Sequence, residues 1–161
     1  MPDPEPTAIT LRPARPDEAG LLTEIALTSK AAWGYDDAFM AACVGPLTVT
    51  PEEINDWIFA VAEDASGEVR GFHAVAVSGG EASLEYMFAL PEYIGTGRGK
   101  LLMRDALAHC KQAGCRVLLV ESDVNAVDFY QAMGGVRIGE AESTAVAKRM
   151  LPLLSFTIEP A

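Results

Sequence analysis

Residues 84–102 read LEYMFALPEYIGTGRGKLL, and this stretch decides the fold. Its first part is apolar and aromatic, which predicts a strand, and Pro91 ends that strand because proline has no N–H for a ladder hydrogen bond. Three glycines follow within residues 95–99, and an apolar stripe at helical spacing then extends to about Gln112. The N–H groups of such a loop and the dipole of the helix after it attract an anion, and phosphate is the obvious one.

The rest of the chain alternates between strand and helix patterns. Strands are expected at residues 9–12, 58–62, 69–77, 82–89, 117–120, 137–140 and 153–158. Helices are expected to begin at Pro16 and Thr50, to include Phe39 and Met40, and to cover residues 100–112 and 126–133. This order predicts a mixed α/β (α+β) fold, with a seven-stranded, mostly antiparallel sheet and helices on both faces. The antiparallel run argues against a doubly wound nucleotide-binding fold.

Length and composition bound the domain organisation. The chain has 161 residues, and 50% of them are hydrophobic, which suggests one domain with a sizeable core. Residues 1–7 contain three prolines and two acids and are expected to be a flexible tail, so that one domain covers residues 8–161. Because neither a signal-peptide pattern nor a membrane-spanning apolar run is present, we expect a cytoplasmic protein with no membrane partner.

The formal net charge of −11 limits the expected partners. Nucleic acid is not among them, because phosphate binding needs clustered Lys and Arg. The same charge would attract a cationic substrate, although solubility alone also accounts for it.

The cysteines and histidines predict no metal site. The three cysteines include no CxxC pair, so that a zinc site is not expected and the thiols should stay reduced. His73 alternates with Val75 and Val77 and is expected to be a packed sheet histidine, whereas His109 is expected to be exposed at the edge of its helix.

The glycines of residues 95–99 are interpreted as one of three kinds of phosphate-binding loop. A P-loop needs GxxxxGK followed by Ser or Thr, and Leu101 follows Lys100 here, which excludes it. A dinucleotide fingerprint needs GxGxxG directly after the strand, and counting from Gly95 places Lys100 at the third glycine. Glu121 does end the next strand, where a ribose-binding acid would lie. The third kind binds the pyrophosphate of coenzyme A.

Two segments favour the third kind by resemblance. Residues 84–102 resemble the acetyl-CoA motif of GNAT acetyltransferases, in which a strand and a proline precede a loop of the form Gln/Arg-x-x-Gly-x-Gly/Ala and then a helix. Gly97 and Gly99 match the two small positions, and Ile94 departs from the usual Gln or Arg. Residues 121–135, ESDVNAVDFYQAMGG, are similar to the later motif of the family, in which Asn opens a helix that bears Phe-Tyr and ends at glycine. The predicted strand order matches the family's fold over nearly the whole chain.

The resemblance implies where acetyl-CoA, the cosubstrate, would bind. The fourth and fifth strands would separate and hold the pantetheine arm, paired with backbone groups of Phe88, Ala89 and Leu90. A backbone N–H near Ala89 would polarise the thioester carbonyl. The other cofactor-binding residues that it implies are Ile94, Gly95, Thr96, Gly97, Arg98, Gly99, Lys100 and Asn125. The amine would attack the carbonyl directly, so that no covalent enzyme intermediate and no metal are needed.

Tyr130 and Glu85 are the candidate catalytic residues. The resemblance makes Tyr130 the general acid for the departing thiolate, which its ordinary pKa of about 10, against about 8.5 for a thiol, permits. Packing of Tyr130 beside Phe129 is the alternative. Glu85 is the candidate base, because a partly buried carboxylate among apolar neighbours has a raised pKa, and a solvated strand residue is the alternative.

The acceptor site is expected to involve the segment after the first helix. Trp33, Tyr35 and Asp36 would form a cage of aromatic faces and a carboxylate around a cation, unless Trp33 and Tyr35 only anchor a turn. Glu121 would orient the acceptor or simply face solvent. Asn125 is expected to cap its helix as well as to contact the cofactor.

These expectations describe an N-acetyltransferase that passes an acetyl group from acetyl-CoA to a primary amine of a small molecule or a peptide. The alternative is a non-catalytic acyl-CoA-binding module, which would keep the glycine loop and have no use for Tyr130 and Glu85. A homodimer through a sheet edge is compatible with the resemblance. The strand that contains Pro152 is the expected edge, because proline lacks a ladder donor.

Overall fold

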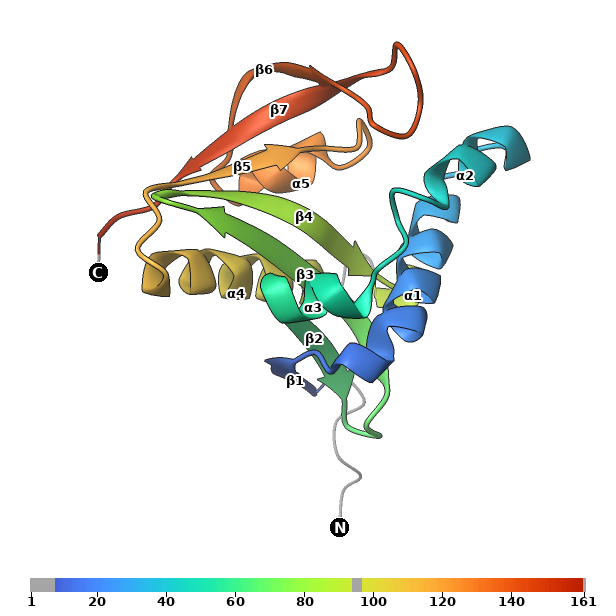
Figure 1. Ribbon diagram of the computed structural model, residues 1–161, viewed down its shortest axis with the longest axis horizontal. Coiled ribbons are helices and arrows are strands. Elements are labelled where there is room, and N and C mark those ends of the chain that lie inside the picture. Colours follow the sequence, from blue (N-terminus) through green and yellow to red (C-terminus); the bar gives the residue numbers. More distant parts are fainter. Residues whose placement is uncertain (1–7, 94–96, 161) are drawn as a thin grey trace.

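Figure 1 shows the computed structural model, which describes residues 8–93 and 97–160. Within these residues the strands are β1 (Ile9–Pro13), β2 (Ile58–Asp64), β3 (Val69–Ser78), β4 (Glu81–Ala89), β5 (Val117–Glu121), β6 (Val136–Glu142) and β7 (Met150–Thr157). The α-helices are α1 (Ala19–Ala31), α2 (Asp37–Cys43), α3 (Pro51–Asp56), α4 (Arg98–Gln112) and α5 (Val127–Ala132). Single 3-10 turns at Pro16–Glu18 and Pro91–Tyr93 precede α1 and follow β4. The predicted tail, residues 1–7, lies outside the described part of the chain.

The strands form one sheet with the order β1-β2-β3-β4-β5-β7-β6. Every neighbouring pair is antiparallel except β4 and β5, which are parallel. The predicted fold class is therefore confirmed, and each predicted strand is present with shifted ends. The predicted start of α3 is also correct: Thr50 accepts from the Glu53 N–H at 3.2 Å, and Glu53 accepts from the Thr50 N–H at 3.0 Å.

The prediction that Pro152 marks an edge strand is wrong. Pro152 lies in β7, which is enclosed between β5 and β6, and β6 is the edge. The proline is tolerated because β5 ends at Glu121, so that the position facing Pro152 is Ser122, just beyond the strand. Ser122 still donates its N–H to the Pro152 carbonyl at 2.9 Å, and only the reciprocal bond at the end of the ladder is lost.

Helices cover both faces of the sheet, and a hydrophobic core fills each interface. Alternation along β3 directs Phe72 and Ala74 toward α1 and α3, and directs His73 and Val75 toward α4. The core under α1 and α3 contains Leu22, Ile25, Ala26, Ile54, Phe59, Val61, Phe72, Ala74 and Tyr86. The core under α4 and α5 contains Val75, Met103, Ala106, Cys110, Leu118, Val120, Tyr130, Leu154 and Phe156. Both cores reach β4, so this strand is fixed from both sides.

The parallel pair β4–β5 is short, and this positions the site. The two strands pair only over residues 81–83 of β4 and 117–119 of β5. Beyond that point they diverge, and the opening is directed toward α1 and α2 (Figure 1). The separation that the resemblance implied is therefore present. None of the helices in the described part of the chain is long and apolar enough to span a membrane.

Candidate active site

A cavity of about 620 Å³ lies where β4 and β5 separate. This volume is within the range that small-molecule sites occupy in proteins, about 300–1,000 Å³. The predicted site residues that line it are Trp33, Glu85, Phe88, Ala89, Gly97, Gly99, Lys100, Glu121, Asn125 and Tyr130. Leu90, Tyr35 and Asp36 are not part of this lining, and Ile94, Gly95 and Thr96 lie outside the described residues. Of the elements that line the cavity, β4, α4 and α5 come from the two motifs that carried the resemblance.

The hydrogen bonds of β4 decide which of its backbone groups face the cavity. Leu90 donates its N–H to the Arg70 carbonyl at 2.9 Å, on the β3 side. Because backbone direction alternates along an antiparallel strand, Phe88 also faces β3, whereas Ala89 and Met87 present their N–H and C=O groups toward β5. Of the three residues expected to pair with the pantetheine arm, only Ala89 has this orientation, and Met87 was missed.

Ser29 holds the end of β4 against α1. Its side chain is buried and donates to the Ala89 carbonyl at 2.9 Å. The carbonyl of Ala89 is therefore engaged, which leaves its N–H as the backbone group of this residue that is directed at the cavity. No sequence signal singled out Ser29, because its partner lies 60 residues away.

The glycine loop leads into α4 through a left-handed residue. Gly97 has φ +88° and is the N-cap of α4, a conformation that a side chain would strain. Helix α4 begins at Arg98, two residues earlier than predicted, so that the free N–H groups of its first turn lie at 98–100. Gly99 and Lys100 line the cavity beside this terminus. The terminus has the features of an anion site: a positive dipole end, free N–H groups and a lysine.

Tyr130 lies in α5 at the wall of the cavity and is 7% exposed. Its ring meets Phe129 and Phe156 edge-on, with centroids 5.2 Å and 6.5 Å away. Burial, with a smaller contribution from the charge of Asp123, raises the pKa of Tyr130 well above its ordinary value. The phenol therefore keeps its proton at neutral pH and can donate it to a strong base.

The two candidate glutamates are both exposed. Glu85 borders the cavity and accepts a hydrogen bond from Ser83, and Glu121 borders it at the end of β5. The expected partial burial of Glu85 among apolar neighbours is wrong: Glu85 is exposed, and it is the residue of β4 left unpaired where the register with β3 shifts. A solvated carboxylate at a cavity rim can still accept a proton through water.

Asp123 organises the mouth of the cavity, and the sequence did not identify it. The Tyr35 hydroxyl lies 2.9 Å from its Oδ1 and 2.8 Å from its Oδ2. Lys30 forms a close ion pair with Asp123, and Arg149 Nη2 lies 3.8 Å from its Oδ2. Burial opposes ionisation, but the hydrogen bonds from Lys30 and the Asn125 N–H outweigh it and lower the pKa of Asp123.

The expected cation cage of Trp33, Tyr35 and Asp36 is not assembled. The faces of Tyr35 and of Phe39, which stacks on it at 3.9 Å, are near the chain's own cations. Lys30 Nζ lies 5.4 Å and the Arg149 guanidinium 5.2 Å from the Tyr35 centroid. Asp36 instead caps α2, accepting from the Phe39 N–H at 2.8 Å. Only Trp33, which is 44% exposed, borders the cavity.

Asn125 has a different role from the expected helix cap. Helix α5 starts at Val127 with Ala126 as its N-cap. The Asn125 amide donates to the Tyr35 hydroxyl at 3.0 Å and to Asp123 Oδ1 at 2.9 Å. It thus belongs to the Asp123 cluster, while still bordering the cavity.

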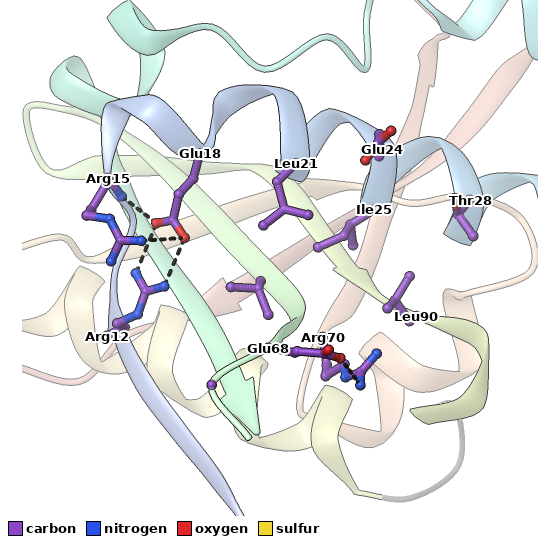
Figure 2. A pocket seen from close by; sticks show the side chains of 12 residues that line it. Arg12, Arg15, Glu18, Leu21, Glu24, Ile25, Thr28, Glu68, Arg70 and Leu90 are labelled. Carbon is purple, nitrogen blue, oxygen red and sulfur yellow. Dashed lines mark hydrogen bonds and ion pairs between the residues drawn. The ribbon is translucent and has the colours of Figure 1, made fainter. Parts of the chain in front are cut away.

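A second hollow, of about 530 Å³, lies between α1 and the β2–β3 turn. Figure 2 shows that Arg12 and Arg15 converge there on Glu18. Arg12 contacts both carboxylate oxygens of Glu18 at 2.9 Å, and this hydrogen bonding holds the pKa of Glu18 below its usual range. Arg70 in turn pairs with Asp64 and Glu68. The three arginines of this hollow each pair with a carboxylate of the chain, and we assign the chemistry to the cavity between β4 and β5.

Comparisons with known proteins identify the family of the chain. The profile of the acetyltransferase (GNAT) domain matches residues 55–134, which include β2 through α5. No curated protein matches the chain significantly. The fold and the profile match together define an acyltransferase. The chain belongs to the GNAT acetyltransferase superfamily.

Many solved structures share the fold. The PaiA N-acetyltransferase from Thermoplasma acidophilum, in complex with coenzyme A, has a TM-score of 0.76 at 18% identity, covering 94% of this chain and 99% of that one. A GCN5-related N-acetyltransferase from Rhodopseudomonas palustris has a TM-score of 0.77 at 17% identity, covering 97% and 99%. The ribosomal-protein-S18-alanine N-acetyltransferase from Escherichia coli has a TM-score of 0.69 at 15% identity, covering 96% of each chain.

Proposed function

We propose that this protein transfers an acetyl group from acetyl-CoA to a primary amine by direct attack. The observation that carries the proposal is the pairing of two groups across one cavity. The Ala89 N–H is directed at it from β4, and the buried phenol of Tyr130 borders it from α5. A donor for a developing oxyanion and an acid for a leaving thiolate are the two groups that acyl transfer from a thioester requires.

The two ends of the cavity would bind different parts of acetyl-CoA. Its pyrophosphate would accept hydrogen bonds from the N–H groups at Gly97, Gly99 and Lys100 at the start of α4, together with residues 94–96. Its pantetheine arm would lie along β4, where the polar groups of Met87 and Ala89 are directed. Asn125 would contact the cofactor from the α5 side. Ile94 does not weaken this proposal, because the loop acts through backbone groups.

An acceptor that arrives as an ammonium group first loses a proton to water, because only the neutral amine has a lone pair, and two further proton transfers then accompany acyl transfer. The amine nitrogen bonds to the thioester carbonyl carbon, whose oxygen is stabilised by the Ala89 N–H, and the carbon–sulfur bond breaks. Tyr130 gives its proton to the departing sulfur and regains one from solvent. The proton that the amine loses passes to Glu85, directly or through water. No residue becomes acylated in this sequence.

The acceptor would be an amine carried by a small molecule or a peptide, entering at the mouth between α1–α2 and the end of β5. Trp33 offers an exposed aromatic face there, and Glu85 and Glu121 offer carboxylates that attract an ammonium group. Since the Tyr35 faces are near Lys30 and Arg149, the attraction for a cationic acceptor comes from these carboxylates and Trp33.

Release of coenzyme A thiol tests the proposal. The protein is incubated with acetyl-CoA and a panel of small amines and peptides that have a free amino terminus. The product is identified by its mass. We expect amine-dependent thiol release and an N-acetylated product. Binding of acetyl-CoA without turnover on any amine would favour the non-catalytic module.

A further inference from the structure

Both histidines of the chain meet one carboxylate on the side of the sheet that α4 covers. His73 lies in β3, and Asp105 and His109 lie in α4. His73 Nε2 is 2.8 Å and His109 Nε2 is 3.3 Å from the same oxygen, Asp105 Oδ2. The three potential ligand atoms lie within 4.8 Å of one another. None of these residues borders the acyl-transfer cavity.

We propose that His73, Asp105 and His109 bind one divalent transition-metal ion of the zinc class. Two imidazoles and one carboxylate form a donor set that such ions take in proteins. The set leaves a further coordination position for water. The sequence did not predict this site, because the chain contains no CxxC pair and because His73 is 32 residues from Asp105.

The spacing suits a tetrahedral ion. Metal–ligand bonds of about 2.1 Å require ligand atoms about 3.4 Å apart. The separation of His109 Nε2 from Asp105 Oδ2, 3.3 Å, already has this value, and that of His73 Nε2, 2.8 Å, must widen by about half an ångström. Asp105 and His109 are four residues apart and therefore project from the same face of α4. The two imidazole nitrogens lie within 4.8 Å of each other, so that all three ligand atoms surround one position.

Burial and charge also suit a cation. The His73 side chain is fully buried, whereas those of Asp105 and His109 are 22% and 36% exposed, so that an ion has a route from solvent. The net charge of −11 raises the local concentration of divalent cations.

The alternative is that His73 forms only a hydrogen bond to Asp105 and binds no metal. One observation also limits the affinity that we expect for a metal ion. His73 Nδ1 is buried without a hydrogen-bond partner among the described residues. Metal-bound histidines ordinarily donate their second nitrogen to an acceptor, and loss of such a partner weakens binding by about 10–100-fold. We therefore expect a dissociation constant in the micromolar range, weaker than that of a structural zinc site.

The site would tie β3 to α4, the helix whose first turn is proposed to bind the coenzyme A phosphates. A bound ion would therefore raise the melting temperature, and the rise would grow with the logarithm of the ion concentration above the dissociation constant. It would leave the chemical groups of the cavity unchanged.

The test uses the full chain without a histidine tag, after removal of metals with a chelator. Calorimetry with Zn²⁺ and visible absorption with Co²⁺ should each give one ion per chain, with the d–d bands of a tetrahedral site. Zn²⁺ should raise the melting temperature and shift the imidazole proton resonances of both histidines. His109→Ala and Asp105→Asn should weaken binding at least tenfold. Arg104→Ala and Lys111→Ala, exposed on the same helix, should not.

Three outcomes would overturn the proposal. One is the absence of saturable binding up to millimolar Zn²⁺ by the folded protein. The second is unchanged binding by His109→Ala, and the third is a thiolate charge-transfer band with Co²⁺, which would assign the ion to a cysteine. Because His109 is partly exposed, its variant should fold, and acetyl-CoA binding provides an independent check of folding.

Discussion

The phenolic oxygen of Tyr35 lies 2.8 Å from Asp123 Oδ2, although 88 residues separate the two in the chain. Tyr35 follows α1 and Asp123 follows β5, so that this contact joins the two sides of the cavity mouth. Arg149, from the segment before β7, donates to the same phenol at 2.8 Å. Three distant segments thus share one partly buried carboxylate, and its removal should loosen the mouth.

Asp123→Asn is expected to lower the free energy of unfolding by about 2 kcal/mol, because charged hydrogen bonds from Lys30 become neutral ones. It should also raise KM for the amine more than KM for acetyl-CoA. Denaturant unfolding and steady-state kinetics measure both. The matched control is Asp128→Asn, an exposed carboxylate in α5, which should change stability by less than about 0.5 kcal/mol. Equal effects of the two variants would contradict the role of Asp123.

The pH dependence of stability provides a separate test of the same carboxylate. Because the pKa of Asp123 is lower in the folded protein than in the unfolded chain, its stabilisation is present above about pH 4 and is lost as the pH falls through the folded value. The difference in unfolding free energy between the wild type and Asp123→Asn should therefore shrink as the pH falls below about 4, through the interval between the unfolded and the folded pKa. A difference that stays constant over this interval would mean that the ionised form gains nothing from Lys30.

Tyr130→Phe is expected to lower kcat at least about 100-fold with little change in acetyl-CoA affinity, because a general acid acts only in the transition state. Tyr86→Phe is the matched control. The Tyr86 hydroxyl is 3.2 Å from Glu53 and 3.4 Å from the Thr48 carbonyl, away from the cavity lining. Its loss should reduce stability by about 1 kcal/mol and leave kcat unchanged. The reverse pattern in the two variants would exclude Tyr130 as the acid.

Gly97 and Gly114 flank α4 with similar left-handed backbones, φ +88° and +82°, and open space where a Cβ would lie. Alanine at either position should cost about 1 kcal/mol of stability through backbone strain. Only Gly97→Ala should also weaken acetyl-CoA, by about tenfold, because it disturbs the N–H groups at the helix start. Calorimetry on both variants separates the two effects, and equal affinities would place the phosphates elsewhere.

The sequence predicted the fold and the cofactor side of the site because both depend on local patterns. Pro91 ends a strand, glycines mark the loop, and α4 has an apolar stripe at helical spacing. Each of these patterns can be recognised in the sequence alone. The acceptor side depends instead on long-range contacts. Asp123, Lys30 and Arg149 are ordinary charged residues in sequence, and only the end of β5 beside the C-terminus of α1 makes them neighbours. The predicted cage failed for this reason: the partners of Tyr35 come from other segments.

The direction of the backbone N–H groups of β4 likewise depends on contacts outside the local sequence. Of residues 88–90, which the motif implied, Phe88 and Ala89 line the cavity and Leu90 does not. The direction of each N–H depends on the register with β3. That register, in which Leu90 faces Arg70, is set by the hairpin between β3 and β4 together with a one-residue shift of the pairing between Ala74 and Val75. One residue of shift would have exchanged the roles of Ala89 and Leu90.

Calorimetric titration with acetyl-CoA tests the central claim most directly, because every proposed step depends on the cavity between β4 and β5 binding that thioester. We predict one site per chain, competition by free coenzyme A, and loss of affinity in Gly97→Ala with affinity retained in Gly114→Ala. If the folded protein bound neither acetyl-CoA nor coenzyme A, acyl transfer at this cavity would be contradicted, and only the GNAT fold would remain.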